Sequence, residues 1–343
     1  MLRFALAALG SFGAVAIARR LFADESDLFG AVAIVTGGSR GLGFLIASEL
    51  AREGCRIAIC ARDGEELERA RVDLERRGAE VIAIRCDVAD PVAATALVEE
   101  TEARLGPLDI LVNNASIIQV APVDALGVKE FQQALAVNFW GTVHPTLAAL
   151  PGMRARRRGR IVNIASIGGK VSVPHLLPYG AAKFATVGFS EGLAAELARD
   201  GVHVTTVIPG LMRTGSYLHA EFEGKAPAEF TWFALGSTLP GISMDAERAA
   251  RRVVRALKRR ELEPILSLPA QLLARVHGLF PGFVIGTLML VNRLLPRAGG
   301  AGERASGLEL QRASGAGALY VATSLGRAAA RRFHEYPPSS RTP

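Results

Sequence analysis

The chain has 343 residues, of which 50% are hydrophobic and 21% are charged, so it can bury a sizeable core and is not a wholly disordered protein. Its three cysteines, Cys55, Cys60 and Cys86, are too few and too irregularly spaced for a disulfide framework or a zinc site, and the six histidines show no metal-ligand spacing. Residues 264–343 hold nine Arg and three Glu and therefore carry +6 of the net charge of +7. This uneven charge argues against a nucleic-acid binder. It favours either a basic tail that contacts a membrane surface or a partner, or a solvated Arg-rich surface.

An uncharged, mostly apolar run of 15 residues, from Phe4 to Ala18, lies near the N-terminus between Arg3 and Arg19. A membrane-spanning helix needs about 20 apolar residues, so this run is short for a span. We predict that residues 1–28 form an apolar N-terminal helix or membrane anchor. A signal peptide, or a helix that packs on its own domain or on a partner subunit, is the alternative.

Short apolar runs alternate with amphipathic stretches from residue 31 to about residue 268. The runs have the length of strands and occupy residues 31–36, 56–61, 80–85, 108–113, 160–165 and 202–208. The helical stretches that separate and follow them occupy residues 42–53, 63–77, 91–105, 127–150, 180–199 and 245–260. Apolar strands that alternate with helices predict an α/β fold, a Rossmann-type doubly wound parallel sheet of about seven strands with helices on both faces. Such sheets bind ligands beyond the carboxyl ends of their strands.

A glycine-rich turn follows the first strand and leads directly into a helix. Gly37 permits the tight turn, Gly41 lets the backbone approach a phosphate, and Gly43 lets the helix pack closely on the strand. The N-terminus of that helix directs its N–H groups and its positive dipole toward an anion. The turn therefore predicts a site for dinucleotide phosphates, which comprises Gly37, Ser39, Arg40, Gly41, Leu42 and Gly43.

The second strand ends just before Arg62 and Asp63, where the adenosine ribose of a dinucleotide would lie. Arg62 and Arg40 can bind a 2′-phosphate together through charge-assisted hydrogen bonds. We therefore predict NADP(H) as the preferred cofactor. NAD(H) is the alternative if Arg62 is only a surface residue and Asp63 binds the ribose.

Further motifs follow the later strands in a fixed order. They are Asp87-Val88 after the third strand, Asn113-Asn114-Ala115 after the fourth, Asn138 in the next helix, and Pro209-Gly210 with Thr214 after the sixth. Together with the turn Thr36-Gly37-x-x-x-Gly41-x-Gly43, these motifs resemble the single-domain branch of the short-chain dehydrogenase/reductase family. The resemblance covers roughly residues 29–270.

The resemblance implies roles for these motifs. Asp87 and Val88 would contact the adenine, Asn114 and Ala115 would line the cofactor site, and the segment from Pro209 through Gly210 to Thr214 would close over the nicotinamide. Asn138 would hold a water in a proton relay as one of the catalytic residues. The chain departs from the family at Ser116, where glycine is usual. This change adds a Cβ near the cofactor and removes no chemical group.

Three residues after the fifth strand form the candidate catalytic set. Tyr179 follows Ser166 by 13 residues, and Lys183 stands four residues further on, so Tyr179 and Lys183 share one face of a helix. A free phenol has a pKa of about 10, which a nearby ammonium lowers. We assign Tyr179 as the general acid in carbonyl reduction and the general base in alcohol oxidation, and Ser166 as a hydrogen-bond donor to the substrate oxygen. Lys183 lowers the pKa of Tyr179 and, by the resemblance, holds the ribose hydroxyls.

Residues 211–244 follow the sixth strand and are expected to select the substrate. They contain Tyr217, Phe222, Phe230, Trp232 and Phe233, which favour an apolar carbonyl or alcohol unless these residues only pack the segment onto its own domain. His175 is also expected to line the substrate pocket. No metal is expected.

We divide the chain into a catalytic domain at residues 29–270 and three C-terminal segments. These are an apolar amphipathic segment at 271–297, interrupted by Pro281-Gly282, a Gly-rich linker at 298–318, and a C-terminal helix and tail at 319–343. The apolar ends favour a lipophilic substrate and make a membrane surface a candidate partner.

The sequence thus predicts an NADP(H)-dependent oxidoreductase that interconverts a carbonyl and a secondary alcohol. The alternative is a non-enzymatic, NADP-binding, membrane-associated scaffold or sensor. We expect a small-molecule substrate and no nucleic acid, and the resemblance implies that a homo-oligomer is an option. Because the cofactor is cytoplasmic, we expect a cytoplasmic protein, with the N-terminal segment as a candidate attachment to the membrane.

Overall fold

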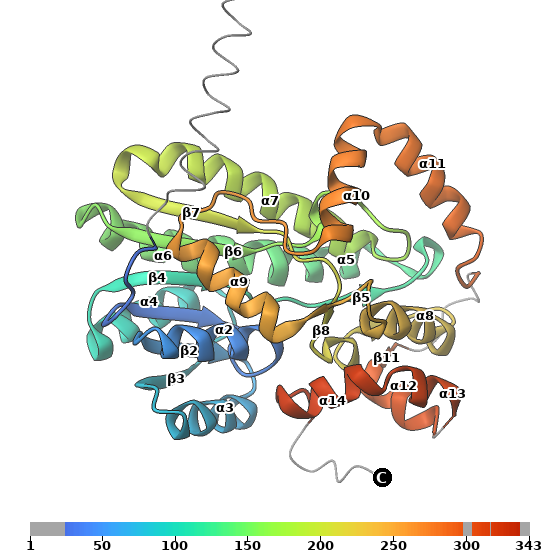
Figure 1. Ribbon diagram of the computed structural model, residues 1–343, viewed down its shortest axis with the longest axis horizontal. Coiled ribbons are helices and arrows are strands. Elements are labelled where there is room, and N and C mark those ends of the chain that lie inside the picture. The colour runs from blue at the N-terminus through green and yellow to red at the C-terminus, as the bar shows by residue number, and fades with distance from the viewer. Residues whose placement is uncertain (1–24, 298–303, 316, 337–343) are drawn as a thin grey trace, which may run out of the picture.

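Six parallel strands form the central sheet, in the order β3-β2-β1-β4-β6-β7 (Figure 1). The computed structural model describes residues 25–297, 304–315 and 317–336. The order runs outward in both directions from the pair of β1 and β4, which is the switch point of a doubly wound sheet, so the Rossmann-type fold is confirmed. The strands are β1 (Val32–Thr36), β2 (Arg56–Ala61), β3 (Val81–Arg85), β4 (Leu108–Asn113), β6 (Gly159–Ile164) and β7 (Val202–Val207).

The central sheet thus has six strands where the sequence predicts about seven. The segment that would form the seventh runs beside β7, with hydrogen bonds from Thr206 N to Leu262 O and from Ile208 N to Pro264 O. Pro264 has no N–H to donate, so a continuous ladder cannot form. The segment contributes only an isolated bridge between Ile208 and Ile265.

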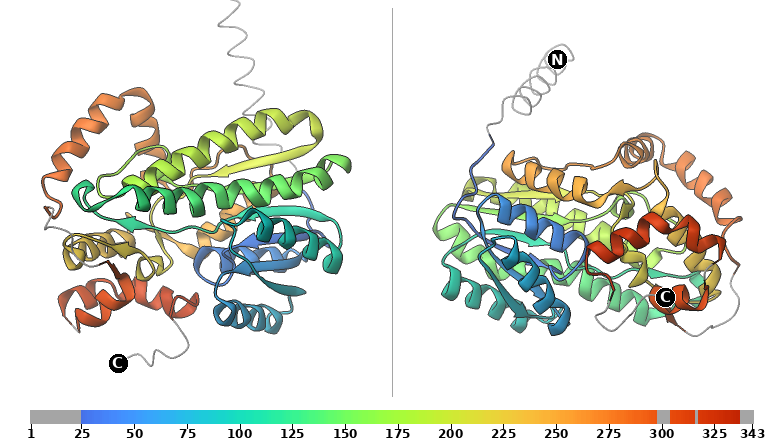
Figure 2. Two further views of the ribbon diagram at one scale, coloured as in Figure 1. Left: turned by 180° about the vertical axis from the view of Figure 1, so that it is seen from behind. Right: turned by 60° about the horizontal axis from the view of Figure 1, so that its bottom comes forward.

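Different helices cover the two faces of the sheet, because alternate residues of a strand point to opposite sides. In β1, Ala33 and Val35 pack with α2, α3 and α9, whereas Val32 and Ile34 pack with α4 and α6 and with the end of α7 (Figure 2). Burial on both sides explains why the strands are almost continuously apolar. The helices are α2 (Gly41–Arg52), α3 (Gly64–Arg76), α4 (Pro91–Leu105), α6 (Gly141–Ala155), α7 (Leu177–Leu197) and α9 (Ala246–Lys258).

The helix predicted at residues 127–150 is not continuous. It consists of α5 (Val128–Ala134), a π-helical turn η2 (Leu135–Trp140) and α6. The wider turn places Asn138 in the interior, with none of its surface exposed. Such π-helical turns are frequent at functional sites.

The segment after β7 and the C-terminal helices form a lobe with its own small core. Tyr217, Phe222, Phe230 and Phe233 are buried there together with Ala330. Two short sheets tie the lobe together, one pairing β8 with β10 and one in the order β11-β9-β5. The elements are β5 (Gln119–Val120), β8 (Met212–Arg213), η5 (Ser216–Leu218), β9 (Glu221–Phe222), α8 (Ala226–Thr238), β10 (Met244–Asp245), β11 (Ala305–Ser306), α12 (Gly307–Ala313), α13 (Ala318–Ala322) and α14 (Ser324–Arg332).

A Gly-rich linker was expected at residues 298–318. Its described part contains β11 and α12, and α12 begins with a capping box between Ser306 and Glu309. The apolar N-terminal helix was expected at residues 1–28, of which residues 1–24 lie outside the described part of the chain.

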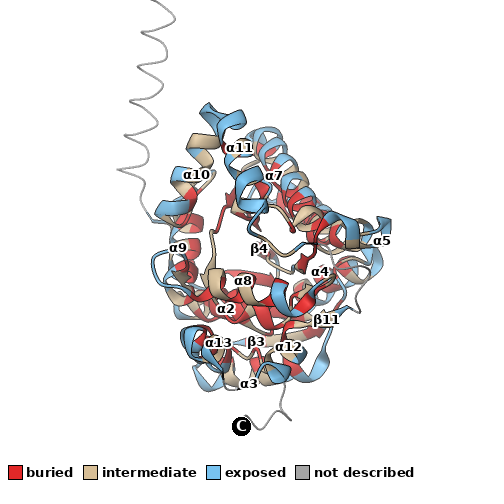
Figure 3. Cartoon of the chain, turned by 90° about the vertical axis from the view of Figure 1, so that its right-hand side faces the viewer, coloured by how far each residue is buried: buried red, intermediate tan, exposed pale blue. Residues whose placement is uncertain are grey.

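Two largely exposed helices stand at the edge of the molecule (Figure 3), and many of their exposed residues are apolar. They are α10 (Leu268–Leu279) and α11 (Pro281–Asn292), which are separated at Phe280 because Pro281 cannot continue α10. In α11 only Val284 is buried, whereas Phe283 is 70% and Met289 66% exposed. Among the residues that the structure describes, no helix is long and apolar enough to span a membrane.

Candidate active site

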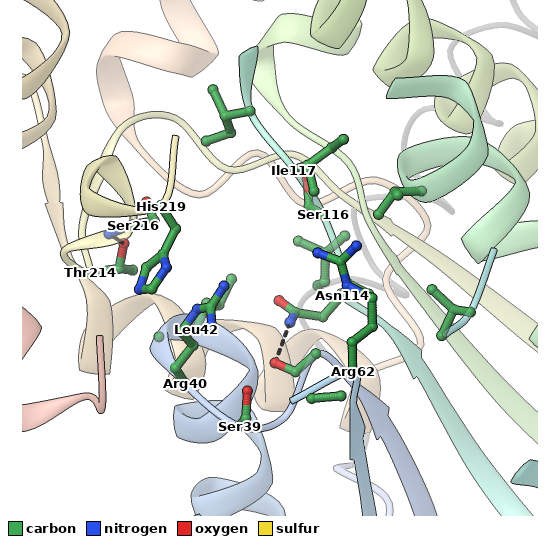
Figure 4. Close-up of a pocket in the computed structure, with 18 of the residues that line it drawn as sticks. Ser39, Arg40, Leu42, Arg62, Asn114, Ser116, Ile117, Thr214, Ser216 and His219 are labelled. Carbon is green, nitrogen blue, oxygen red and sulfur yellow. Dashed lines mark hydrogen bonds between the residues drawn. The ribbon is translucent and has the colours of Figure 1, made fainter. Parts of the chain in front are cut away.

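A cavity of about 1320 Å³ lies beyond the carboxyl ends of the central strands (Figure 4). Sites for drug-sized ligands measure about 300–1,000 Å³, so this cavity has room for a dinucleotide together with a substrate. Of the predicted site residues, Gly43 and Asn138 lie beside the cavity rather than on its wall. The others line it, namely Gly37, Ser39, Arg40, Gly41, Leu42, Arg62, Asp87, Val88, Asn114, Ala115, Ser166, Tyr179, Lys183, Pro209, Gly210 and Thr214.

The glycine turn has the geometry of a phosphate cradle. Gly37 and Gly41 have φ angles of +62° and +55°, in the left-handed region that favours glycine. A Cβ on Gly43 would lie 2.1 Å from the carbonyl oxygen of Gly37, so only glycine allows α2 to begin this close to β1. Helix α2 also has no acidic residue in its first turn and no side-chain cap from Arg40, so its own residues do not neutralise its positive N-terminus. These features fit the diphosphate of a dinucleotide.

Two arginines, Arg62 and Arg85, line the part of the cavity at the ends of β2 and β3, together with acidic residues such as Asp63. Arg62 is exposed and extends into the cavity (Figure 4), and Arg85 Nε donates to Arg62 O at 3.0 Å. Asp63 accepts a hydrogen bond from Glu66 N at 2.9 Å and so caps α3. Sequence reasoning missed Arg85, although its position at the end of β3 was a usable signal.

The segment after β4 is held by Thr36 at the end of β1. Thr36 Oγ1 accepts hydrogen bonds from Asn114 N at 2.9 Å and Ala115 N at 3.1 Å, which ties the end of β4 to the end of β1. Asn114 Nδ2 donates to Thr36 O at 3.0 Å. This network fixes the floor of the cavity between the two central strands.

Asn138 holds the continuation of that segment. Its Oδ1 accepts from Ser116 Oγ and Ile117 N, both at 2.9 Å, and its Nδ2 donates to Ile117 O at 3.1 Å. Ser116, the departure from the family pattern, therefore adds a hydrogen bond to Asn138. The backbone oxygen of Asn138 accepts from Thr186 Oγ1 of α7 at 3.0 Å, so η2 also positions the helix that carries Tyr179.

The hydroxyl groups of Ser166 and Tyr179 meet beside Gly168. Ser166 Oγ accepts from Gly168 N at 3.0 Å, which leaves the serine hydrogen free to donate. A Cβ on Gly168 would lie 3.1 Å from Tyr179 Cε1 and 3.5 Å from Ser166 Oγ, so the missing side chain keeps this corner open. Burial raises the pKa of Tyr179, and its hydrogen bond with Ser166 lowers that pKa by less.

Lys183 is a buried cation next to the tyrosine ring. Lys183 is 2% exposed. Its Nζ donates to Ile164 O at 2.9 Å and lies 5.8 Å from the centre of the Tyr179 ring. Burial lowers the pKa of Lys183 to about 8. Burial thus raises the pKa of Tyr179 in the free protein, which is the opposite of the lowering expected from Lys183.

The aromatic residues of segment 211–244 face away from the cavity. Tyr217, Phe222, Phe230 and Phe233 are buried in the core of the lobe, so they pack the segment, as the alternative interpretation held. His175 is also not on the cavity wall. It is buried, and its Nδ1 lies 2.9 Å from both carboxylate oxygens of Glu229. The residues of the segment that do line the cavity are Met212, Thr214, Ser216, His219, Ala220 and Glu221.

Comparisons with known proteins identify the family of this chain. The family model described as short chain dehydrogenase matches residues 31–221. The chain is 40% identical over 185 residues to granaticin polyketide synthase putative ketoacyl reductase 1 of Streptomyces violaceoruber (53% of this chain, 68% of the relative). It is 33% identical over 262 residues to putative oxidoreductase SadH of Mycobacterium tuberculosis (74% and 93%). The solved structure of a putative short-chain dehydrogenase from Novosphingobium aromaticivorans matches with a TM-score of 0.64 at 26% identity (76% and 88%).

The chain therefore belongs to the short-chain dehydrogenase/reductase family and is an NAD(P)-dependent oxidoreductase.

Proposed function

We propose that this enzyme interconverts a carbonyl and a secondary alcohol with NADP(H), with Tyr179 as the acid–base residue. The observation that carries the proposal is the convergence of Ser166, Tyr179 and Lys183 on the cavity that also holds the glycine turn. A scaffold that only binds the cofactor would not need all three groups at one point.

The chain's own residues perform the proton chemistry. The nicotinamide cofactor, when bound, supplies the hydride in reduction and takes it in oxidation. Ser166 Oγ donates a hydrogen bond to the substrate oxygen, and Tyr179 gives that oxygen a proton or removes one. An ammonium has three N–H groups, and Ile164 O takes one of those on Lys183, so two remain for the ribose hydroxyls and the phenol. Asn138 acts by positioning residues 116–117 and α7.

An apolar substrate is the class we propose. The wall of the cavity includes Ile117, Ile118 and Val137, next to the polar Gln133. Apolar walls with a few convergent polar groups bind greasy ligands and orient the reacting atom. A panel of aliphatic, aromatic and acyl-chain carbonyls, followed by NADPH and NADH absorbance in parallel, tests the proposal. Consumption of neither cofactor with any member would support the scaffold or sensor instead.

NADP(H) preference depends on Arg62 in this proposal. We expect R62A to weaken NADPH binding by about 10- to 100-fold, because a hydrogen bond to a charged group contributes about 1.5–3 kcal/mol. NADH binding should change by less than about threefold. Fluorescence titration of both cofactors measures this, with R104A on the exposed face of α4 as the control. An equal effect of R62A on both cofactors would exclude a contact with the 2′-phosphate.

We also propose that α10 and α11 contact an anionic membrane surface and bring the enzyme to a lipophilic substrate. Residues 264–297 contain no acidic residue and include Arg275, Arg293 and Arg297. Large side chains such as Phe283, Met289 and Leu290 are exposed on α11. Exposed apolar groups flanked by arginines suit a headgroup layer that is negatively charged.

The double variant F283D/L290D is expected to reduce binding to phosphatidylglycerol vesicles by more than tenfold, because each buried large side chain contributes about 1.5–3 kcal/mol. Co-sedimentation of the full chain measures the bound fraction. V92D, which alters an exposed apolar residue on α4, is the matched control. Unchanged binding of the double variant, or no vesicle binding by the unaltered protein, would rule out this surface.

A further inference from the structure

The C-terminal segment 333–336 reaches the glycine turn of the cofactor site. Gly41 N, at the start of α2, donates to Phe333 O at 2.8 Å. A Cβ on Gly41 would lie 2.5 Å from Glu335 Oε1 and 3.9 Å from Thr214 Cβ, so the carboxyl group stands directly over the turn. Glu335 lines the same cavity as Ser39 and Leu42. The views in Figure 2 show the end of α14 beside α2.

Packing fixes this position. Phe333 is 4% exposed, and the ring of His334 lies 4.5 Å from that of Phe44 in α2, measured between ring centres. His334 Nε2 lies 3.0 Å from Asp73 Oδ2, and Arg69 donates to Tyr336 O at 3.3 Å. These contacts hold segment 333–336 in place, so the segment forms part of the wall of the cofactor site.

The carboxyl group of Glu335 is buried among few compensating charges. Its residue is 2% exposed, and Oε2 lies 3.4 Å from Arg40 Nε and 3.2 Å from His219 Nε2. The Arg40 guanidinium also pairs with Glu66 of α3, so two carboxyl groups share one cation. His219 Nε2 lies 2.8 Å from Glu335 O, and since a carbonyl only accepts, this nitrogen carries a proton and donates.

These surroundings disfavour the ionised form of Glu335. Burial raises its pKa to about 8, Arg40 opposes that rise, and the charge of Glu66 adds to it. Burial lowers the pKa of His219 to about 4, so His219 is neutral and supplies no positive charge near neutral pH.

We propose that Glu335 is a residue of the cofactor site whose carboxyl group must be neutral for the cofactor diphosphate to bind at the N-terminus of α2. A neutral carboxyl group can donate its O–H to a phosphate oxygen. An ionised carboxylate at the same place repels the diphosphate and competes with it for Arg40 and for the positive end of α2. This assignment depends on the dinucleotide site and is independent of the substrate.

The sign of the pH dependence follows from this repulsion. Below about pH 8 the carboxyl group is already protonated, so cofactor binding carries no proton cost. Above that pH, binding must take up a proton, and the Kd rises by up to tenfold per pH unit. Lys183 titrates in the same region and contributes its own pH dependence, which the comparison of variants cancels.

The test is the Kd of NADPH for the full chain between pH 6.5 and 9.5, by fluorescence titration, for the unaltered protein, E335Q and the control E99Q on the exposed face of α4. We expect E335Q to match the unaltered protein at pH 6.5 and to bind at least fivefold more tightly at pH 9.5, with E99Q unchanged. Calorimetry at pH 8.5 in buffers of different ionisation enthalpy should show proton uptake by the unaltered protein and less by E335Q. Parallel pH profiles for the two proteins, or equal proton uptake, would overturn the proposal.

Discussion

Replacing Tyr179 with Phe is expected to lower kcat by about 10³-fold or more, because a positioned acid–base group contributes about 10²–10⁴-fold to the rate. The change removes the phenolic oxygen and keeps the ring beside Gly168 and Lys183, so the cavity keeps its shape. The Kd of NADPH should therefore stay within about twofold. Steady-state turnover with a carbonyl from the panel and a fluorescence titration measure the two quantities.

The matched control makes the same change outside the catalytic set. Tyr217 donates to Gln311 at 3.3 Å in the core of the lobe, so Y217F removes a phenolic hydroxyl without touching the reacting atoms. We expect Y217F to keep at least half of the turnover. If Y179F kept a tenth of the activity or more, another group would have to supply the proton.

The central sheet could be predicted closely because its strands are buried on both faces. Burial on both faces makes each strand an uninterrupted apolar run, and the glycines and polar residues at its end stand out against that background. The predicted runs at 56–61 and 108–113 coincide with β2 and β4. The cavity-lining residues after β1 and β4 followed directly, since the ends of parallel strands meet at one edge.

The lobe could not be predicted in the same way, since its packing depends on contacts distant in sequence. The aromatic residues near position 230 look like a substrate pocket when only their neighbours along the chain are considered. In the structure Phe222 and Phe230 pack with Ala330 from a helix about a hundred residues later. Periodicity carries no information about such pairings.

For the same reason, neither the position of Glu335 nor the π-helical turn at Asn138 could be predicted from the sequence. Glu335 is one acidic residue in a polar, Arg-rich tail, and nothing local indicates that it meets Gly41. The extra residue in η2 leaves the apolar pattern of residues 127–150 helical in appearance. Both features become visible only when the hydrogen bonds of the backbone are known.

Changing Gly43 to Ala is expected to destabilise the fold and weaken cofactor binding together. The new Cβ would lie 2.1 Å from Gly37 O and 2.5 Å from Asn114 Nδ2, and the first of these atoms belongs to the backbone and cannot rotate away. Overpacking of this kind costs about 1–3 kcal/mol. To relieve the clash, α2 must move away from β1, and this movement displaces the phosphate cradle. We expect a lower Tm and a rise of more than tenfold in the Kd of NADPH.

G188A is the control, because Gly188 lies in the interior of α7 with no heavy atom within 4 Å of its added Cβ. Alanine in a helix interior is favoured over glycine by about 0.5–1 kcal/mol, so G188A should raise the Tm slightly and leave the Kd unchanged. Thermal unfolding and fluorescence titration on the two variants separate a clash from a general effect of alanine. If G43A bound NADPH as tightly as the unaltered protein, the close contact between the first turn of α2 and β1 would not be what holds the cradle in shape.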